Sequence, residues 1–365
     1  MNAPSPANPS GKLQQALAVQ RRRESRRLLW MGILLLVLLG TVLADIFTGP
    51  SLLPFREVID ILMHPPFPAL GFDHPDAADG LVTIVWDFRL PVALMAIVVG
   101  AALGLGGAEM QTLLDNPLAS PFTLGFSAAA GFGAALAIMF GGLLPVPGYA
   151  LTPAAAFGMT LAACALIYLL ALARGANPEV LILGGIAVLF FFQSVQSLLQ
   201  YIASPEILQQ IVFWLFGDLQ KASWTSVSVC AVVLLACLPF VARDAWALTA
   251  LRLGDANAMS IGVPVQAIRR RAFVLVALLT AVAVCFVGTI GFVGLIAPHM
   301  ARALVGEDHR FALPLAALTG ALILSGASVF AKLISPGAVV PVGIITAVAG
   351  VPMLLGIIVS RKGGI

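Results

Sequence analysis

Few residues of this 365-residue sequence have the types and spacing that catalysis requires. The nucleotide-binding loop G-x-x-x-x-G-K-[ST] is absent, because the one Gly-Lys pair, Gly11-Lys12, is followed by Leu13. The zinc-protease pattern H-E-x-x-H and the serine-nucleophile pattern G-x-S-x-G are absent as well. We therefore expect a chain that is not an enzyme and has no ATPase site of its own.

Residues that could carry protons or hold a metal are sparse in the apolar part of the chain. Its acidic residues fall near the ends of expected helices: Asp45, Glu109, Asp115 and Glu179. An ion-coupled secondary transporter usually places such groups near the middle of the bilayer, so that class is the less favoured alternative. No cysteines have C-x-x-C spacing, and His299 and His309 do not form a ligand pattern. We expect no cofactor and no metal.

The segment from Asp115 to Pro121 interrupts the helical pattern. Pro117 and Pro121 remove backbone donors, while the side chains of Asn116 and Ser120 can hydrogen-bond to neighbouring backbone groups. The residues alone leave two interpretations open: a gate beside a translocation path, or a plain connection between two helices.

A second irregular segment, residues 251–262, contains glycine near each end. Its apolar residues have the spacing of one stripe on a short helix that is capped near Asp255. The stripe residues are Leu253, Ala256, Met259 and Ile261. No Lys/Arg-rich face accompanies the stripe, as a helix that lies on lipid headgroups would have. A protein partner is therefore expected on this segment.

The elements that must hold these segments are membrane helices. The sequence is 60% apolar and 10% charged, whereas soluble domains are about 25% charged. The apolar runs are continuous and do not alternate, which favours helices over a barrel. We expect an all-α polytopic membrane protein with ten transmembrane helices, at about 28–47, 90–112, 119–140, 149–173, 180–202, 223–242, 270–290, 294–306, 311–333 and 340–360.

The distribution of basic residues orients these helices. With the N-terminus in the cytoplasm, sixteen of the 20 Lys and Arg residues fall inside. The four outside are Arg56, Arg89, Lys221 and Lys332. We expect both termini in the cytoplasm, residues 1–27 as a disordered basic tail and residues 28–365 as the ten-helix domain. The net charge of +3 gives no indication of nucleic-acid binding.

A series of short motifs follows in order along residues 28–365. The motifs are Phe88–Pro91, Val99–Leu103, Gln111, Asn116–Pro121 with Leu124-Gly125, Trp214–Gly217, Leu253–Gly262, Gly291–His299 with Arg302, and Pro341–Thr346 with Gly350–Pro352. Together they resemble the FecCD-type permeases of ABC importers, which carry iron–siderophore complexes, haem and vitamin B12. The resemblance implies a multi-pass protein of the bacterial inner membrane. It implies a ferric-siderophore-type chelate as substrate, with haem, cobalamin or an oxyanion as alternatives.

The resemblance also implies partners and site residues. The partners are two ABC ATPase subunits, a periplasmic substrate-binding protein, membrane lipid and a second copy of the permease or a related one. The coupling loop to the ATPase spans about 246–264 and includes Leu253, Gly254, Asp255, Ala256, Ala258, Met259, Ile261 and Gly262. The cytoplasmic gate and path comprise Asn116, Pro117 and Leu118, faced by the loop around Pro178 and Glu179.

On the periplasmic side, the resemblance implies that Arg89 and Lys332 dock the binding protein. The sequence departs from the family's pattern at three nearby positions. These are Val92, Ser328 and Val339, where an arginine, an aspartate and a glutamate are common.

Overall fold

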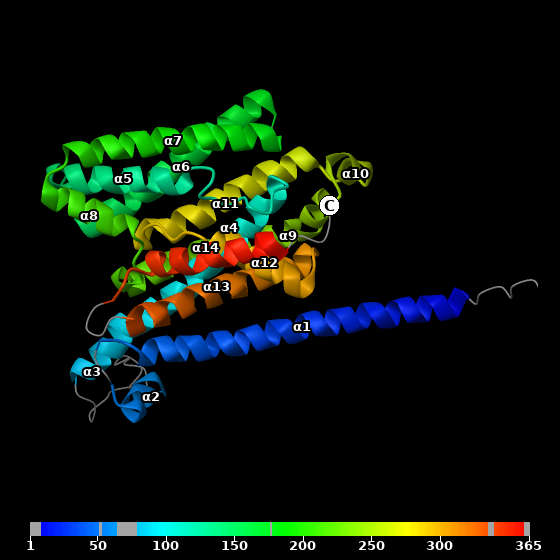
Figure 1. Cartoon of the computed structure of the whole chain (residues 1–365), viewed down its shortest axis with the longest axis horizontal. Helices are drawn as coiled ribbons and strands as arrows, with labels where there is room; N and C mark the ends of the chain where they lie inside the picture. Colours follow the sequence, from blue (N-terminus) through cyan, green and yellow to red (C-terminus); the bar gives the residue numbers. More distant parts are fainter. Residues whose placement is uncertain (1–8, 51–52, 64–78, 176, 335–338, 361–365) are drawn as a thin grey trace, which may run out of the picture.

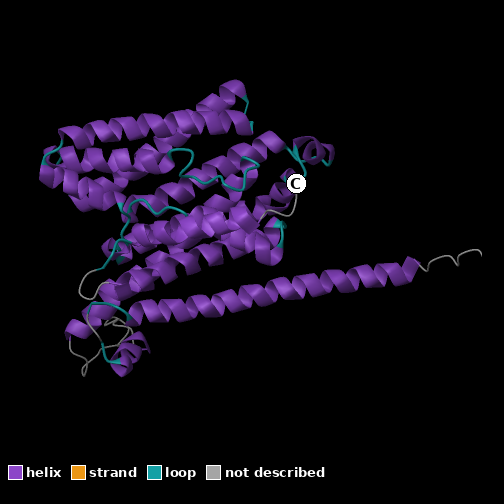
Figure 2. Cartoon of the chain, in the orientation of Figure 1, coloured by secondary structure: helices purple, strands orange, loops and turns teal. Residues whose placement is uncertain are grey.

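The computed structural model describes residues 9–50, 53–63, 79–175, 177–334 and 339–360, which form helices and no strand (Figures 1 and 2). The helices are α1 (Pro9–Phe47), α2 (Phe55–Met63), α3 (Asp79–Thr83), α4 (Leu90–Leu113), α5 (Phe126–Phe140), α6 (Gly148–Arg174), α7 (Pro178–Ile202), α8 (Pro205–Leu215), α9 (Trp224–Leu251), α10 (Asp255–Ser260), α11 (Val265–Val287), α12 (Val293–Val305), α13 (His309–Ile334) and α14 (Val342–Ser360). A π-helical turn, Ile84–Arg89, joins α3 to α4.

The expected all-helical membrane fold is confirmed. In the described part of the chain, eight helices are long and apolar enough to cross a membrane. Two shorter apolar helices, Val293–Val305 and Val342–Gly356, add to these. Each of the ten expected segments therefore has its helix.

Helix α4 is the centre of the bundle, and nearly all of its residues are buried. It packs against α9, α11, α12 and α13. Its glycines let the backbones touch: a Cβ on Gly104 would lie 2.2 Å from the carbonyl oxygen of Ala316 in α13. A Cβ on Gly107 would lie 1.8 Å from the carbonyl oxygen of Gly294 in α12. Membrane helices associate through such close packing, because the hydrophobic effect does not favour contact between helices that are surrounded by lipid.

The two ends of the bundle differ (Figure 1). One end, the α10 end, carries α10, the start of α1 and the end of α14. The opposite end, the α2 end, carries α2 and α3. There a small separate core joins these helices to α1 and α4 through Ile46, Val58, Ile61, Val85 and Ala93.

The structure corrects the expected disordered tail. Helix α1 begins at Pro9, so residues 9–27 continue the first span, while residues 1–8 lie outside the described part. The segment is rich in good helix formers, and the Gln20 amide donates to the Glu24 carboxylate at 3.1 Å, one turn away. With 39 residues α1 is about 58 Å long, twice what a bilayer core needs.

Three other boundaries differ from expectation. Helix α5 begins at Phe126, seven residues later than expected, because the segment before it forms turns. Helix α9 continues to Leu251, which shortens the expected coupling loop to residues 252–264. Helix α8 lies between two expected spans, where no helix was assigned. Its start carries a recognisable signal: Ser204 accepts the Ile207 N–H at 3.4 Å, and Pro205 and Glu206 follow it.

Candidate functional site

The α10 segment stands at the end of the bundle between α9 and α11 (Figure 1). Gly254 and Gly262 flank it with φ of 91° and 83°, conformations that side chains other than glycine rarely adopt. The short helix begins at Asp255, where the sequence predicted its cap, and Gly254 occupies the N-cap position. Asp255 accepts two hydrogen bonds from the Arg269 guanidinium in α11, at 2.9 and 3.0 Å.

The expected apolar stripe is exposed to solvent. Leu253 is 64% exposed, Met259 58% and Ile261 53%, and Ala256 is exposed with them. On the other side of the segment Ala258 and Val263 are buried and hold α10 against the bundle. The segment therefore presents an apolar surface outward from a fixed base.

A second pair of charges, Asp244 and Arg271, joins α9 to α11. Asp244, which is 2% exposed, accepts from the Nε of Arg271 and, at 2.6 Å, from one of its terminal nitrogens. Two-point pairs of this kind fix orientation as well as distance. With Asp255–Arg269, this pair makes α9, α10 and α11 one mechanical unit, which we term the α10 unit.

The segment 114–125 folds into successive turns beyond α4. The Asn116 side chain accepts the Leu118 N–H at 2.9 Å, and the Asn116 carbonyl accepts the Ala119 N–H at 3.1 Å. Asp115 adopts φ of 44°, which is uncommon for a residue other than glycine. Asn116 and Pro117 are half-buried and Leu118 is exposed. The turn is thus a defined structure beside the core.

Pro178 and Glu179 were expected in a loop. In the structure they form the first turn of α7. In the described part of the chain, no hydrogen bond or ion pair joins them to Asn116–Leu118. The turn meets α7 further along. A Cβ on Gly185 would contact Leu124, and one on Gly125 would contact Leu189. Gly185 and Leu189 are therefore points where α7 contacts the end of the turn segment.

Two of the sequence motifs meet behind this turn. Gln111 in α4 accepts from the Arg302 guanidinium at 2.5 Å and donates to the Leu295 carbonyl at 3.2 Å. Arg302 also lies 3.6 Å from Glu307, which pairs with Arg252 at 3.1 Å. The end of α4, helix α12 and the end of α9 are thereby connected through side chains.

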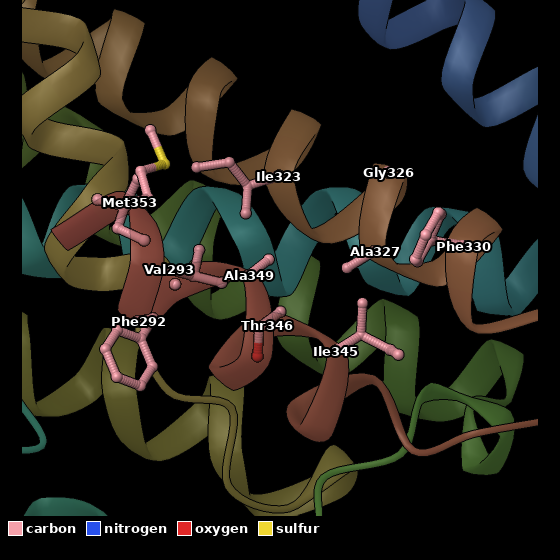
Figure 3. Close-up of a pocket in the computed structure, with 12 residues that line it drawn as sticks. Phe292, Val293, Ile323, Gly326, Ala327, Phe330, Ile345, Thr346, Ala349 and Met353 are labelled. Carbon is pink, nitrogen blue, oxygen red and sulfur yellow. The ribbon is translucent and has the colours of Figure 1, made fainter. Parts of the chain in front are cut away.

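A hollow of about 420 Å³ lies between the turn, α5 and α7. Its polar lining is uncharged: Thr123, Ser127, Gln193, Gln196 and Thr289. Figure 3 shows a different hollow, of about 340 Å³, between α12, α13 and α14. Thr346 is the one polar side chain among its 12 lining residues, and its hydroxyl donates to the Gly343 carbonyl at 3.0 Å. The first hollow therefore suits a polar ligand and the second does not.

The structure corrects the expected position of Arg89 and Lys332. They are 6% and 9% exposed and do not lie on a docking surface. The Lys332 ammonium lies 3.0 Å from the carboxylate of Asp45, which is fully buried, and Arg89 donates to the Ile46 carbonyl at 2.8 Å. These contacts join α1 to the start of α4 and the end of α13, and they supply the partners that a buried charge requires.

Sequence reasoning also missed the environment of Glu109 in α4. Its carboxyl group is fully buried, and neither oxygen has a hydrogen-bond partner among the residues that the structure describes. The acid was expected near a helix end, where water would reach it. Within the described residues, no three His, Cys, Asp or Glu side chains come together to hold a metal ion.

Comparison with known proteins agrees with the arrangement of these motifs. The model of the FecCD transport family matches residues 34–360. The chain belongs to the FecCD transport family. Within this family it is 33% identical over 355 residues to the vitamin B12 import system permease protein of Klebsiella pneumoniae, covering 95% of this chain and 98% of that protein.

A second relative in this family is the hemin transport system permease protein of Yersinia pestis. It is 34% identical over 335 residues, which cover 92% of this chain and 96% of that protein. A solved structure, described as an inward-facing transporter assigned to the metal-chelate ABC type, matches with a TM-score of 0.76 and 30% identity. The match covers 91% of this chain and 98% of that one. This FecCD chain is a multi-pass membrane permease of the ABC importer type.

Proposed function

We propose that this permease imports a ferric-siderophore-type chelate across the bacterial inner membrane, driven by two separate ATPase subunits. The observation that carries the proposal is the α10 unit. An apolar surface is displayed in water at one end of the bundle, although water disfavours it, and two-point ion pairs hold its base. A partner protein that covers Leu253, Met259 and Ile261 would remove that cost.

In this proposal the α10 end faces the cytoplasm and α10 is the coupling helix. The ATPase subunits close on ATP and push α10. Because Asp255–Arg269 and Asp244–Arg271 tie α10 and α9 to α11, the push moves these helices together. The motion reaches the turn 116–118 through α4, which packs against both α9 and α11. The turn then opens or closes the path as the gate.

The translocation path is proposed to run along α7, at the interface with a second copy of the permease or a related one. Helix α7 exposes large apolar residues that a partner would cover: Leu183, Phe190, Phe191, Leu198 and Tyr201. The hollow lined by Gln193 and Gln196 lies on the same helix. Its uncharged hydrogen-bonding groups suit a large polar chelate that must bind weakly and move on.

A periplasmic binding protein is proposed to deliver the chelate at the α2 end. Since Arg89 and Lys332 are buried, the cations available to meet acidic groups are the exposed Arg56 and Lys221. Both were expected outside the membrane by the distribution of positive charge. Charges at the rim of an interface chiefly raise the association rate.

The test of the coupling role is co-purification of the permease with its ATPase subunits. Met259→Glu places a charge within the apolar surface and should abolish the complex. Leu143→Glu is the matched control, because Leu143 is 82% exposed, follows α5 and lies outside the α10 unit. It should leave the complex intact. An intact complex in the Met259→Glu variant would remove α10 as the docking site.

The substrate is tested separately, in vesicles that contain the permease, its ATPase subunits and its binding protein. We expect ATP-dependent uptake of a radioactive ferric siderophore, unaffected by a proton uncoupler. Uptake of haem or cobalamin and not of the siderophore would change the proposed substrate but leave the proposed importer mechanism in place. Uptake that needs no ATPase and is abolished by an uncoupler would contradict the proposed ATP-driven mechanism.

A further inference from the structure

A groove of about 530 Å³ lies between α4, α9 and α13, and no step of the transport proposal uses it. Leu105 and Leu313 are buried and form its inner wall, while Leu238, Ala242 and Pro314 are exposed at its rim. The groove opens sideways between two helices that are long enough to span the membrane. Its open side therefore faces either lipid or another membrane helix.

One end of the groove is polar. His309, in the first turn of α13, lies there with its Nε2 2.7 Å from the Thr112 hydroxyl of α4. Its backbone N–H donates to the Thr249 hydroxyl of α9 at 3.0 Å. These contacts close the groove on the side of α10. Arg310 lies beside His309, and its side chain is 62% exposed.

Positive charge exceeds negative charge at this end. In the short connection between α12 and α13, Asp308 is shared by Arg310 at 2.8 Å and Arg27 at 3.3 Å. Glu307 is likewise shared by Arg252 and Arg302. Glu24 of α1 also acts electrostatically on Arg310. Four arginines thus face three carboxylates, which leaves a surplus of one positive charge at this end of the groove.

We propose that this groove binds one acyl chain of an anionic phospholipid, whose phosphate group lies at Arg310. An apolar slot that ends in surplus cationic charge at the membrane surface has the chemistry of a phospholipid and no features of a polar solute site. A membrane helix from another protein would cover the apolar rim but would not use the charge.

The two parts of the groove have different roles. The acyl chain gains little from leaving bulk lipid, because lipid is as apolar as the groove, so the slot fixes position. Selectivity comes from the arginine. An anionic headgroup is attracted by about 1 kcal/mol per basic residue near the surface, which is about fivefold in preference.

The test uses the full chain, purified in detergent, and native mass spectrometry with phosphatidylglycerol and phosphatidylcholine of identical acyl chains. Arg310→Gln should lower the preference for phosphatidylglycerol about fivefold. Ala242→Trp should fill the slot and remove one retained lipid of either kind. The matched controls are Arg270→Gln, an exposed arginine outside the groove, and Ala236→Trp, an exposed alanine elsewhere on α9. Both should behave like the unaltered chain.

Three outcomes would overturn the proposal. One is an unchanged lipid preference in Arg310→Gln. Another is equal lipid loss in Ala242→Trp and Ala236→Trp, which would mean that retention is not specific to the groove. The third is displacement of the lipid by inorganic phosphate, which would identify the cationic end as a site for the free anion.

Discussion

Helix α4 makes close contacts with α12 and α13 at Gly104 and Gly107, which we term the seam. The seam and the α10 unit are held together in different ways. In the seam, glycine lets α4 touch the backbones of α12 and α13, and uncharged or singly charged hydrogen bonds such as Gln111 to the Leu295 carbonyl add to this contact. In the α10 unit, carboxylates and guanidinium groups join α9, α10 and α11 at two points. The two regions of this chain are thus joined by different contacts, close backbone approach around α4 and ion pairs in the α10 unit.

The strongest test of this comparison is Gly107→Ala in the seam. The new Cβ would lie 1.8 Å from the Gly294 carbonyl oxygen, so α4 and α12 must separate. Overpacking of this kind costs about 1–3 kcal/mol, and more where only backbone can yield. We expect loss of folded protein in detergent size-exclusion chromatography. Gly106→Ala is the control, because its Cβ would meet nothing closer than 3.7 Å. Equal loss of folded protein in the two variants would show that the close contact between Gly107 and Gly294 is not required for the packing of α4 against α12.

The next largest effect is expected for Lys332→Met, which tests whether an ion pair also joins α13 to α1 at the α2 end. The change removes the ammonium that lies 3.0 Å from the fully buried Asp45 carboxylate and leaves only the more distant electrostatic attraction of Arg89. Removal of one partner of a buried pair costs about 3–5 kcal/mol in soluble proteins, and less where the remaining acid can take up a proton. Thermal unfolding should show a clear loss of stability. The double variant Asp45→Asn/Lys332→Met should recover most of it. A double variant as unstable as the single one would contradict the pairing.

A smaller effect on stability, with a specific effect on function, is expected for Arg269→Gln. The change removes the hydrogen bonds between Asp255 and Arg269 at the base of α10. Charged hydrogen bonds contribute about 1.5–3 kcal/mol to the free energy of unfolding, and we expect less here because Asp255 is partly exposed. ATP hydrolysis should continue while substrate transported per ATP falls. Arg270→Gln, its exposed neighbour, should leave this ratio unchanged. The exchanged pair Asp255→Arg/Arg269→Asp should restore part of it.

The smallest effect concerns pH. The hydrogen bond from Arg310 lowers the pKa of the Asp308 carboxyl group below its usual 3.8. A lowered pKa means that the pair stabilises the fold above pH 3.8 and that this contribution is lost as the pH falls through the lower, folded value. Because Arg310 is exposed, the contribution is about 1 kcal/mol or less. The difference in melting temperature between the unaltered chain and Asp308→Asn should be constant from pH 7 to pH 5 and shrink below pH 4. A difference that grows below pH 4 would contradict the assignment.

The sequence predicted features that depend on local spacing. The ten helical segments follow from runs of apolar residues, and the stripe at Leu253, Met259 and Ile261 follows from helical periodicity. The start of α8 carries a local signal at Ser204-Pro205-Glu206, which could have been used. The N-terminal tail was expected to be disordered because its polar composition was given more weight than the helix propensity of residues 9–27.

The features that the sequence did not predict depend on residues far apart in the chain. The pairing of Asp255 with Arg269 was not predicted, because Arg269 lies 14 positions later on another helix. Lys332 was interpreted as a docking residue because its partner, Asp45, lies 287 positions away. No spacing rule connects such positions. The motifs indicate the family, and the folded structure assigns individual charges to buried or exposed places.

The most direct test of the central claim, that α10 is the moving part on which the ATPase acts, is photo-crosslinking from its exposed surface. A benzophenone amino acid placed at Met259 should crosslink to the ATPase subunit in the assembled transporter, and the yield should change when ATP is added. The same group at Leu143, which is 82% exposed and outside the α10 unit, should give no such product. An assembled, active transporter without a crosslink at Met259, or with equal crosslinking from Leu143, would contradict the account.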